Sequence, residues 1–508
     1  MIIVILLCHC RKLFLWEYKK IDMLSPKTLT QNTTYYTGAL MLQKILAFVY
    51  FTFLARGLGV EDLGKYSFAF SFTTIFSVFV DVGLNSVLTR EVAKDKEQTK
   101  KILANVLGIK TILSLFTYLL IVGLINLMGY PALTKNLVYL TGIIMLLDTF
   151  SATFWGVLRG NQNLKFESLG IILFQAIVVG LGMFLLYLNV GVALQVLAVL
   201  AGSSFLFLYS LFEMYRRTRI VPTINFDKSL IKTLLKIAIP FALTGILARL
   251  NTQVDTIFLS KVGCANQQIC DTNVGIYSVA TKITLAIHFI PLAFVAALFP
   301  AMSEYYANNK EKLSRVFEKA MRYLMIISLP VAFGIGVLAP DFVPKIFGVE
   351  YKSAVLPLQI LMFSLIFLFL TFPIGSLLNA TSRQLLNTKQ VAIAALINFL
   401  LNFLLVPKFT YIGGAFSSLI STLVMFYLGL RVSGKIMTYN HKYLWQSFWQ
   451  CFLSGIIMAA VLWLLLFKLH FIILIILGPV IYFSCLLLFK GLTKSDFSDM
   501  LISMKIKR

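Results

Sequence analysis

Charged residues are scarce in this sequence of 508 residues. They make up 13% of the chain and hydrophobic residues 59%, whereas about a quarter of the residues of a soluble protein are charged. A water-soluble fold is therefore excluded. No loop between the apolar runs is long enough to fold by itself. This excludes a soluble catalytic domain and a glycosyltransferase with a long acidic outer loop, so we expect no enzyme activity.

Metal ligands and nucleotide-binding motifs are lacking as well. The chain has six cysteines and four histidines, and no histidine or acidic residue completes a metal set around a cysteine. The run from Gly59 to Lys65 resembles the start of a P-loop, but Tyr66 stands where Ser or Thr would hold magnesium. We therefore expect no metal and no cofactor, and leave coupling to a proton or cation gradient open.

Fourteen apolar runs approach or exceed the ~20 residues that a membrane-spanning helix needs. They are predicted at 34–56, 63–88, 103–128, 133–158, 168–188, 192–214, 236–259, 275–301, 322–340, 354–379, 389–406, 412–431, 446–467 and 470–490. A tail at 1–33 precedes the first run, and either Met1 or Met23 is the start of the chain.

The 45 Lys and Arg residues are distributed unevenly between the two predicted sides of the membrane. With the first tail inside, inside segments hold 33, outside loops hold 8, and the remaining four lie within spans. This is the positive-inside pattern. It predicts a multi-pass protein of the cytoplasmic membrane with both termini cytoplasmic, and it explains the net charge of +24 without nucleic acid.

A short repeat divides the chain into two related parts. Gly64-Lys-Tyr-Ser-Phe-Ala69 recurs 211 residues later as Gly275-Ile-Tyr-Ser-Val-Ala280, and Lys101 and Lys312 keep the same offset. Six spans separate the copies, so the repeat is parallel and predicts two six-helix lobes that face each other across a cavity. The two glycines indicate a place where a missing Cβ lets backbones approach.

These residues are part of a wider pattern. It comprises the run from Arg56 to Tyr66, Asp81-Val-Gly83 before Arg90-Glu91, the repeat copy at 275–280, and Pro340 before Phe347-Gly-Val-Glu-Tyr351. In order and spacing the pattern resembles the polysaccharide (O-antigen type) flippases of the multidrug, oligosaccharidyl-lipid and polysaccharide exporter superfamily. The resemblance covers residues 34 to 490.

The resemblance implies an all-α membrane protein with two pseudo-symmetric six-helix lobes around a central cavity, plus two C-terminal helices. The lobes are predicted at 34–222 and 223–437, and 438–508 holds the last two spans and a tail. The implied function is a flippase that moves a polyprenyl phosphate- or pyrophosphate-linked oligosaccharide to the outer leaflet by alternating access, for cell-surface polysaccharide. A cation-coupled exporter of organic cations and a non-transport scaffold for envelope assembly are the alternatives.

Ionisable residues within the spans are the candidate site, because a charge in the apolar core costs about 2.5 to 3.5 kcal/mol. The cations Lys44, Lys110, Arg249 and Lys282, with His288, are predicted to bind the phosphate groups of the substrate. The alternative is that Lys110 and Lys282 reach the membrane surface, and that Lys44 and Arg249 pair with acids. Four cations against three acids favour an anionic cargo.

Acidic residues have different predicted roles. Asp148 and Asp255 are candidates for proton or cation coupling, with a fixed ion pair as the alternative, and Asp81 with Arg90 and Glu91 for a cytoplasmic gate. Cys264 and Cys270 share an outside loop, where a disulfide and two free thiols are both open. The expected partners are membrane lipid, the lipid-linked oligosaccharide and a glycan polymerase or other assembly proteins, and we expect a monomer.

Overall fold

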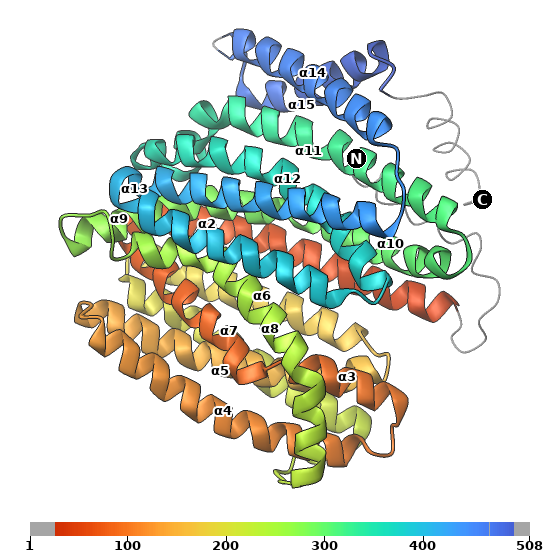
Figure 1. Ribbon diagram of the computed structural model, residues 1–508. Coiled ribbons are helices and arrows are strands. Elements are labelled where there is room, and N and C mark those ends of the chain that lie inside the picture. The colour runs from red at the N-terminus through yellow and green to blue at the C-terminus, as the bar shows by residue number, and fades with distance from the viewer. Residues whose placement is uncertain (1–25, 467, 492–508) are drawn as a thin grey trace. The chain divides into compact units, whose positions relative to one another are not determined.

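The protein is nearly all helical (Figure 1). The computed structural model describes residues 26–466 and 468–491, and this part of the chain contains no β-strand. The predicted start at Met1 or Met23 and the outer parts of both tails lie outside the described residues. The predicted all-helical membrane fold is confirmed.

Fifteen residue ranges, most of them long helices, make up the described chain. In order they are α2 (Pro26–Asp81), α3 (Leu84–Lys94), α4 (Thr99–Leu127), α5 (Ala132–Gly160), α6 (Lys165–Tyr187), α7 (Val192–Thr218), α8 (Lys228–Leu259), α9 (Gln267–Ile287), α10 (Phe289–Asn308), α11 (Lys310–Phe347), the 3₁₀ helix η1 (Val349–Ala354), α12 (Val355–Ala380), α13 (Gln384–Ile436), α14 (His441–Leu465) and α15 (Phe471–Leu488).

The number of spans depends on how bent helices are counted. Among the described residues, eleven helices are long and apolar enough to cross a membrane, or twelve if the bent helix α8 is one span. Two of the eleven have 47 and 53 residues, more than twice the ~20 that a span needs. These are α2 and α13, which contain non-helical backbone at Gly59 and Thr410. The predicted number of fourteen remains a prediction.

The predicted span at 63–88 is divided in the structure. Helix α2 ends at Asp81, because the next two residues, Val82 and Gly83, have positive φ angles of 43° and 77°, outside the α-helical range. The chain resumes as the short helix α3, whose buried face consists of Leu84, Val87, Leu88 and Val92. This amphipathic pattern is typical of a helix that packs on a protein surface.

Polar residues begin several helices by capping their free N–H groups. The side chain of Asp227 accepts hydrogen bonds from the N–H groups of Ser229 and Leu230 at the start of α8. Asn309 caps α11 and Asn440 caps α14 in the same manner. Within the apolar interior, the helical backbone satisfies its own hydrogen bonds, which a membrane requires.

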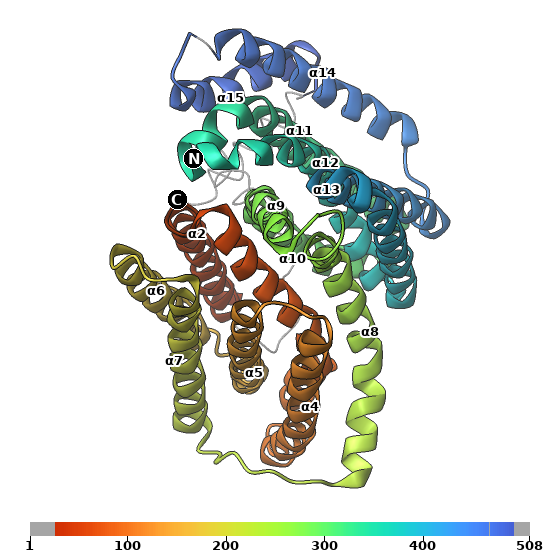
Figure 2. The same cartoon turned by 90° about the vertical axis from the view of Figure 1, so that its left-hand side faces the viewer.

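The chain forms two compact units. One comprises residues 23–278 and 399–414, which we call the α2–α8 unit, and the other contains residues 279–398 and 415–508. In the α2–α8 unit, α5 packs against α4 and α7 (Figures 1 and 2). In the other unit, α11 packs against α12 and α14, and α14 against α15. The division predicted at 222 and 437 rests on the repeat, and remains a prediction.

The glycines of the repeat lie where α2 and α9 cross, within the α2–α8 unit. A Cβ on Gly64 would lie 1.8 Å from the carbonyl oxygen of Asp271, and a Cβ on Gly275 would lie 2.0 Å from the carbonyl oxygen of Val60. The backbones therefore touch in a reciprocal manner. The prediction that these glycines permit a close backbone approach is confirmed. Gly64 on α2 lies against the backbone of α9, and Gly275 on α9 lies against the backbone of α2.

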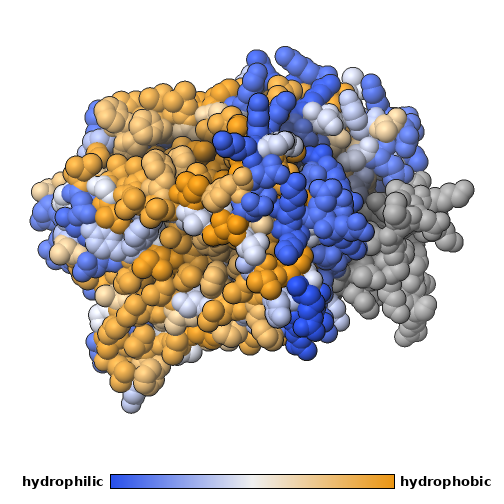
Figure 3. Space-filling view, turned by 90° about the horizontal axis from the view of Figure 1, so that it is seen from below, coloured by the Kyte–Doolittle hydropathy of each residue, from blue (hydrophilic) through white to orange (hydrophobic). Residues whose placement is uncertain are grey.

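Apolar side chains dominate the face shown in Figure 3, and hydrophilic ones gather toward its margins. Many large apolar residues of the spans are exposed, among them Leu115, Phe116 and Leu119 on α4. A soluble protein rarely exposes so much apolar surface. The exposed helix faces are therefore suited to lipid.

Candidate functional site

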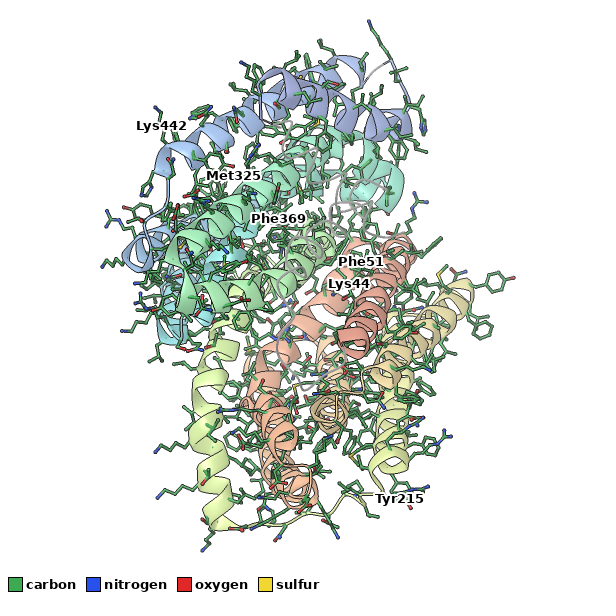
Figure 4. The ribbon with its side chains drawn as sticks, turned by 90° about the vertical axis from the view of Figure 1, so that its right-hand side faces the viewer. Lys44, Phe51, Tyr215, Met325, Phe369 and Lys442 are labelled. Atoms are coloured by element: carbon green, nitrogen blue, oxygen red, sulfur yellow. A yellow bond between two sulfur atoms is a disulfide. The ribbon has the colours of Figure 1, made fainter. Side chains whose placement is uncertain are left out.

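Lys44 and Arg249 are exposed cations within membrane-spanning helices of the α2–α8 unit. Lys44 lies on the first half of α2, as does Phe51 (Figure 4), and Arg249 lies in the second half of α8. Within the described part of the chain, neither side chain takes part in an ion pair. The alternative that they pair with Asp148 or Asp255 is therefore not what the structure shows.

An exposed, unpaired cation in mid-span has few environments open to it. Facing lipid would cost about 2.5 to 3.5 kcal/mol on insertion scales. Facing water or an anion removes most of that cost. Lys44 follows Gln43 directly, and the apolar side chains of Leu42 and Ile45 nearby are also exposed. Both cations are thus suited to a polar space that admits an anionic ligand.

Arg249, Thr252 and Thr256 form a polar stripe along α8, because they are spaced at i, i+3 and i+7. Arg249 and Thr252 are exposed, whereas Thr256, one turn further, is buried. Thr252 donates its hydroxyl to the carbonyl oxygen of Ala248 at 3.1 Å, as threonines in helices often do. The stripe therefore presents Arg249 outward and leads toward buried polar groups around Asp255.

Asp255 belongs to a buried polar cluster that we call the Asp255 cluster. The hydroxyl of Tyr277 donates to Oδ2 of Asp255 at 2.7 Å, and Nδ2 of Asn402 donates to Oδ1 at 2.6 Å. All three residues are buried, and they come from α8, α9 and α13. Tyr277 and Asn402 were not predicted as site residues. Tyr277 is part of the repeat, and Asn398 and Asn402, four residues apart in an apolar run, were an available signal.

Lys110 is held by a second, partly buried cluster, the Lys110 cluster. Its Nζ lies 2.9 Å from Oδ1 of Asp81, 2.8 Å from Oδ1 of Asn85 and 2.7 Å from Oγ1 of Thr153. The side chain is 0% exposed. Because a lysine has three N–H donors, all are engaged by the protein. Lys110 does not reach the membrane surface, and we leave it out of the proposed substrate site.

The remaining predicted site residues lie at separate places. Asp148 on α5 is exposed and lies near Ser203 on α7. Lys282 on α9 is exposed, and His288 lies at the junction of α9 and α10. Both belong to the unit of residues 279–398 and 415–508, and both have contacts within the protein. Their predicted role in substrate binding remains a prediction.

Arg90 and Glu91 lie on α3. Glu91 pairs with Lys94 at 2.8 Å and with Arg90 at 3.8 Å, all on the same helix. Asp81, the third predicted gate residue, pairs with Lys110 instead. Glu91 and Asp81 therefore both have cationic partners within the α2–α8 unit. A gate between the lobes remains a prediction.

One end of the α2–α8 unit carries the two cysteines and a polar network. A disulfide joins Cys264 to Cys270, with 5.4 Å between their Cα atoms, which is within the usual range. Beside it, Nε2 of Gln268 donates to Oε2 of Glu61 at 2.8 Å, and Lys65 pairs with the other oxygen of Glu61. The network links the bend of α2 to the start of α9, next to the glycine crossing.

Comparison with known families identifies the chain. The family model described as polysaccharide biosynthesis protein matches residues 29–306, and a second model, MatE, matches residues 240–404. The first covers more than half of the 508 residues. The predicted resemblance to polysaccharide exporters is thereby confirmed.

Individual relatives and a solved structure agree with this. The capsular polysaccharide biosynthesis protein CapF of Staphylococcus aureus is 23% identical over 78% of this chain and 97% of its own length. The probable low-salt glycan biosynthesis flippase Agl15 of Haloferax volcanii is 24% identical, over 82% and 85%. The lipid II flippase MurJ, in an inward closed conformation, shares the fold with a TM-score of 0.73 at 18% identity, over 89% and 97%. The chain belongs to the polysaccharide biosynthesis protein family.

Proposed function

We propose that this protein is a flippase that moves a polyprenyl phosphate- or pyrophosphate-linked oligosaccharide from the inner to the outer leaflet of the cytoplasmic membrane. The observation that carries the proposal is the pair of exposed, unpaired cations, Lys44 and Arg249, on spanning helices of one compact unit. The names of the relatives CapF and Agl15, and the fold shared with MurJ, support it.

The two cations suit a phosphate chemically. A guanidinium donates two parallel hydrogen bonds to phosphate oxygens, and an ammonium supplies a compact charge with three rotatable donors. In a space of low dielectric such bonds are stronger than in water. The sugar would travel with the phosphate through the polar space, while the polyprenyl tail stays in lipid.

The proposal is tested with Arg249. Because a hydrogen bond to a charged group contributes about 1.5 to 3 kcal/mol, Arg249→Ala should weaken substrate affinity roughly tenfold to a hundredfold. Arg249→Lys should restore part of the loss, since the charge remains while the fork does not. Glycan export and protein level are measured in the same cells. Reduced export at a normal protein level supports binding, whereas lost protein with proportionate export indicates a structural role.

The orientation of the flippase follows from its charges. We propose that both termini are cytoplasmic, because 33 Lys and Arg residues lie in predicted inside segments and 8 in outside loops. Reporter fusions at Lys19 and Lys505 should be active only in the cytoplasm. Activity of either fusion outside the membrane would reverse the orientation.

The Asp255 cluster is the proposed coupling site. It places a carboxylate, a hydroxyl and an amide from α8, α9 and α13 within 2.7 Å contacts. Protonation or cation binding at the carboxylate would alter these contacts and so favour one arrangement of three helices. Asp255→Asn should abolish the dependence of export on an ion gradient. A variant whose export still follows the gradient would contradict this role.

An exporter of organic cations is the second candidate, because MatE matches residues 240–404. Such a substrate would be attracted by acids rather than by Lys44 and Arg249. Resistance of cells to cationic dyes distinguishes the two. Resistance that rises with expression of this protein would favour the exporter, and unchanged resistance with altered glycan export would favour the flippase.

A further inference from the structure

The first half of α8 carries a row of exposed lysines. Lys228, Lys232 and Lys236 follow one another at intervals of four residues, and all three are exposed. Within the described residues, none of them takes part in an ion pair. They differ in this from Lys101 nearby, which pairs with Asp227 at 3.0 Å.

The opposite side of this half-helix packs on the protein. Leu234 and Ala238 belong to a buried cluster with residues of α3, α4, α5 and α7, and Ile231 and Leu235 pack against it. The packing fixes the rotation of the helix about its axis. The lysines are therefore held outward by the fold.

The lysine row continues as an apolar row on the same side of α8. Ile239 is 59% exposed and Leu243 is 50% exposed. At 100° per residue, Ile239 falls within the arc of about 80° that the three lysines span, and Leu243 follows after the bend of 44° in α8. One helix face thus changes from basic to apolar within a single turn. This change is typical of the boundary between lipid headgroups and hydrocarbon.

The linker that precedes α8 is hydrogen-bonded to α4 and exposes apolar side chains. It runs from the end of α7 past the ends of neighbouring helices to the start of α8 (Figure 2), and Tyr215 near the end of α7 marks its beginning in Figure 4. The N–H of Asn225 donates to the carbonyl oxygen of Ala104 at 3.2 Å, and that of Asp227 to Oδ1 of Asn105 at 2.7 Å. Although the linker is thus attached to α4, Val221 and Ile224 are each 58% exposed.

We propose that Lys228, Lys232 and Lys236 form a binding surface for the phosphate headgroups of anionic phospholipids. The lysines contact the phosphates. Ile239 and Leu243, further along α8, and Val221 and Ile224, in the preceding linker, contact the acyl chains. Charge complementarity and the basic-to-apolar change on one helix face select a lipid surface over a soluble partner. The proposal does not depend on what the protein transports.

The test uses the purified full-length chain in a neutral detergent. Its thermal unfolding is followed while dioleoylphosphatidylglycerol, dioleoylphosphatidylcholine or inorganic phosphate is added, since a ligand of the folded state raises the melting temperature. The test variant carries Lys228→Gln, Lys232→Gln and Lys236→Gln. The control variant carries Lys319→Gln, Lys435→Gln and Lys442→Gln, which remove the same charge from exposed positions on other helices.

We expect phosphatidylglycerol to stabilise the wild type and the control variant with similar apparent affinity. Each lysine near a lipid surface is worth about a fivefold change in affinity, so the test variant should bind roughly a hundredfold more weakly. Replacing the same three lysines with arginine should preserve binding, which separates charge from folding. Equal affinity in the test and control variants would overturn the proposal, and so would equal stabilisation by phosphatidylcholine or by inorganic phosphate.

Discussion

Replacing Gly64 with alanine should separate α2 from α9. The new Cβ would lie 1.8 Å from the carbonyl oxygen of Asp271, whereas ordinary contact begins near 3.4 Å. The two backbones must therefore move apart by roughly 1.6 Å, because a carbonyl oxygen cannot rotate away as a side chain can. Overpacking costs about 1 to 3 kcal/mol, and a backbone clash belongs at the upper end, near 3 kcal/mol.

The assay is thermal unfolding of the purified protein in detergent. At about 2.1 cal/mol/K per residue, a loss of about 3 kcal/mol lowers the melting temperature of a unit of roughly 270 residues by about 5 °C. Gly180→Ala on α6 is the matched control, because nothing lies within 4 Å of its added Cβ. That variant should be unchanged or gain about 0.5 to 1 kcal/mol from helix propensity. Equal melting of the two variants would refute the crossing.

Three further predictions concern charges and sulfur. Lys110→Met leaves Asp81 without its partner and should lower the free energy of unfolding by about 3 kcal/mol, measured by thermal unfolding. This is the lower limit for a broken buried ion pair, because Asp81 is partly exposed. The Lys101 pair and the helix cap lower the pKa of Asp227, so its contribution to stability is present above its usual pKa and lost as the pH falls below it. Asp227→Asn should therefore unfold more easily than the wild type at pH 7, and the difference between the two should shrink as the pH is lowered towards 3. Cys264 and Cys270 should resist thiol labelling in intact, non-reduced protein, and labelling of both would exclude the disulfide.

The close approach of the two repeat glycines could be predicted from the sequence. The copies that begin at Gly64 and Gly275 lie in register, and a glycine at a helix crossing has a direct physical reason. The long apolar runs also sufficed for an all-helical membrane fold. The break at Val82 and Gly83 could not be predicted, because valine at a positive φ angle is uncommon and the apolar run continues through it.

The partners of buried charges could not be predicted from spacing. Lys110 lies 29 positions after Asp81, on the next long helix, and only the packing of α2, α4 and α5 brings its acceptors together. Asn402 meets Asp255 across 147 positions for the same reason. Conversely, Lys44 and Arg249 could be chosen as candidate site residues from the sequence, because a charge in lipid has a high free energy. Both are exposed in the structure.

The most direct measurement is the binding of a short-chain polyprenyl pyrophosphate to the purified protein. The double variant Arg249→Ala, Lys44→Ala is compared with the wild type and with Lys319→Ala, Lys435→Ala, which removes two exposed cations of the other unit. If the two cations bind the phosphates, the double variant should bind at least a hundredfold more weakly while melting like the wild type. Unchanged affinity of a stable double variant would contradict the account.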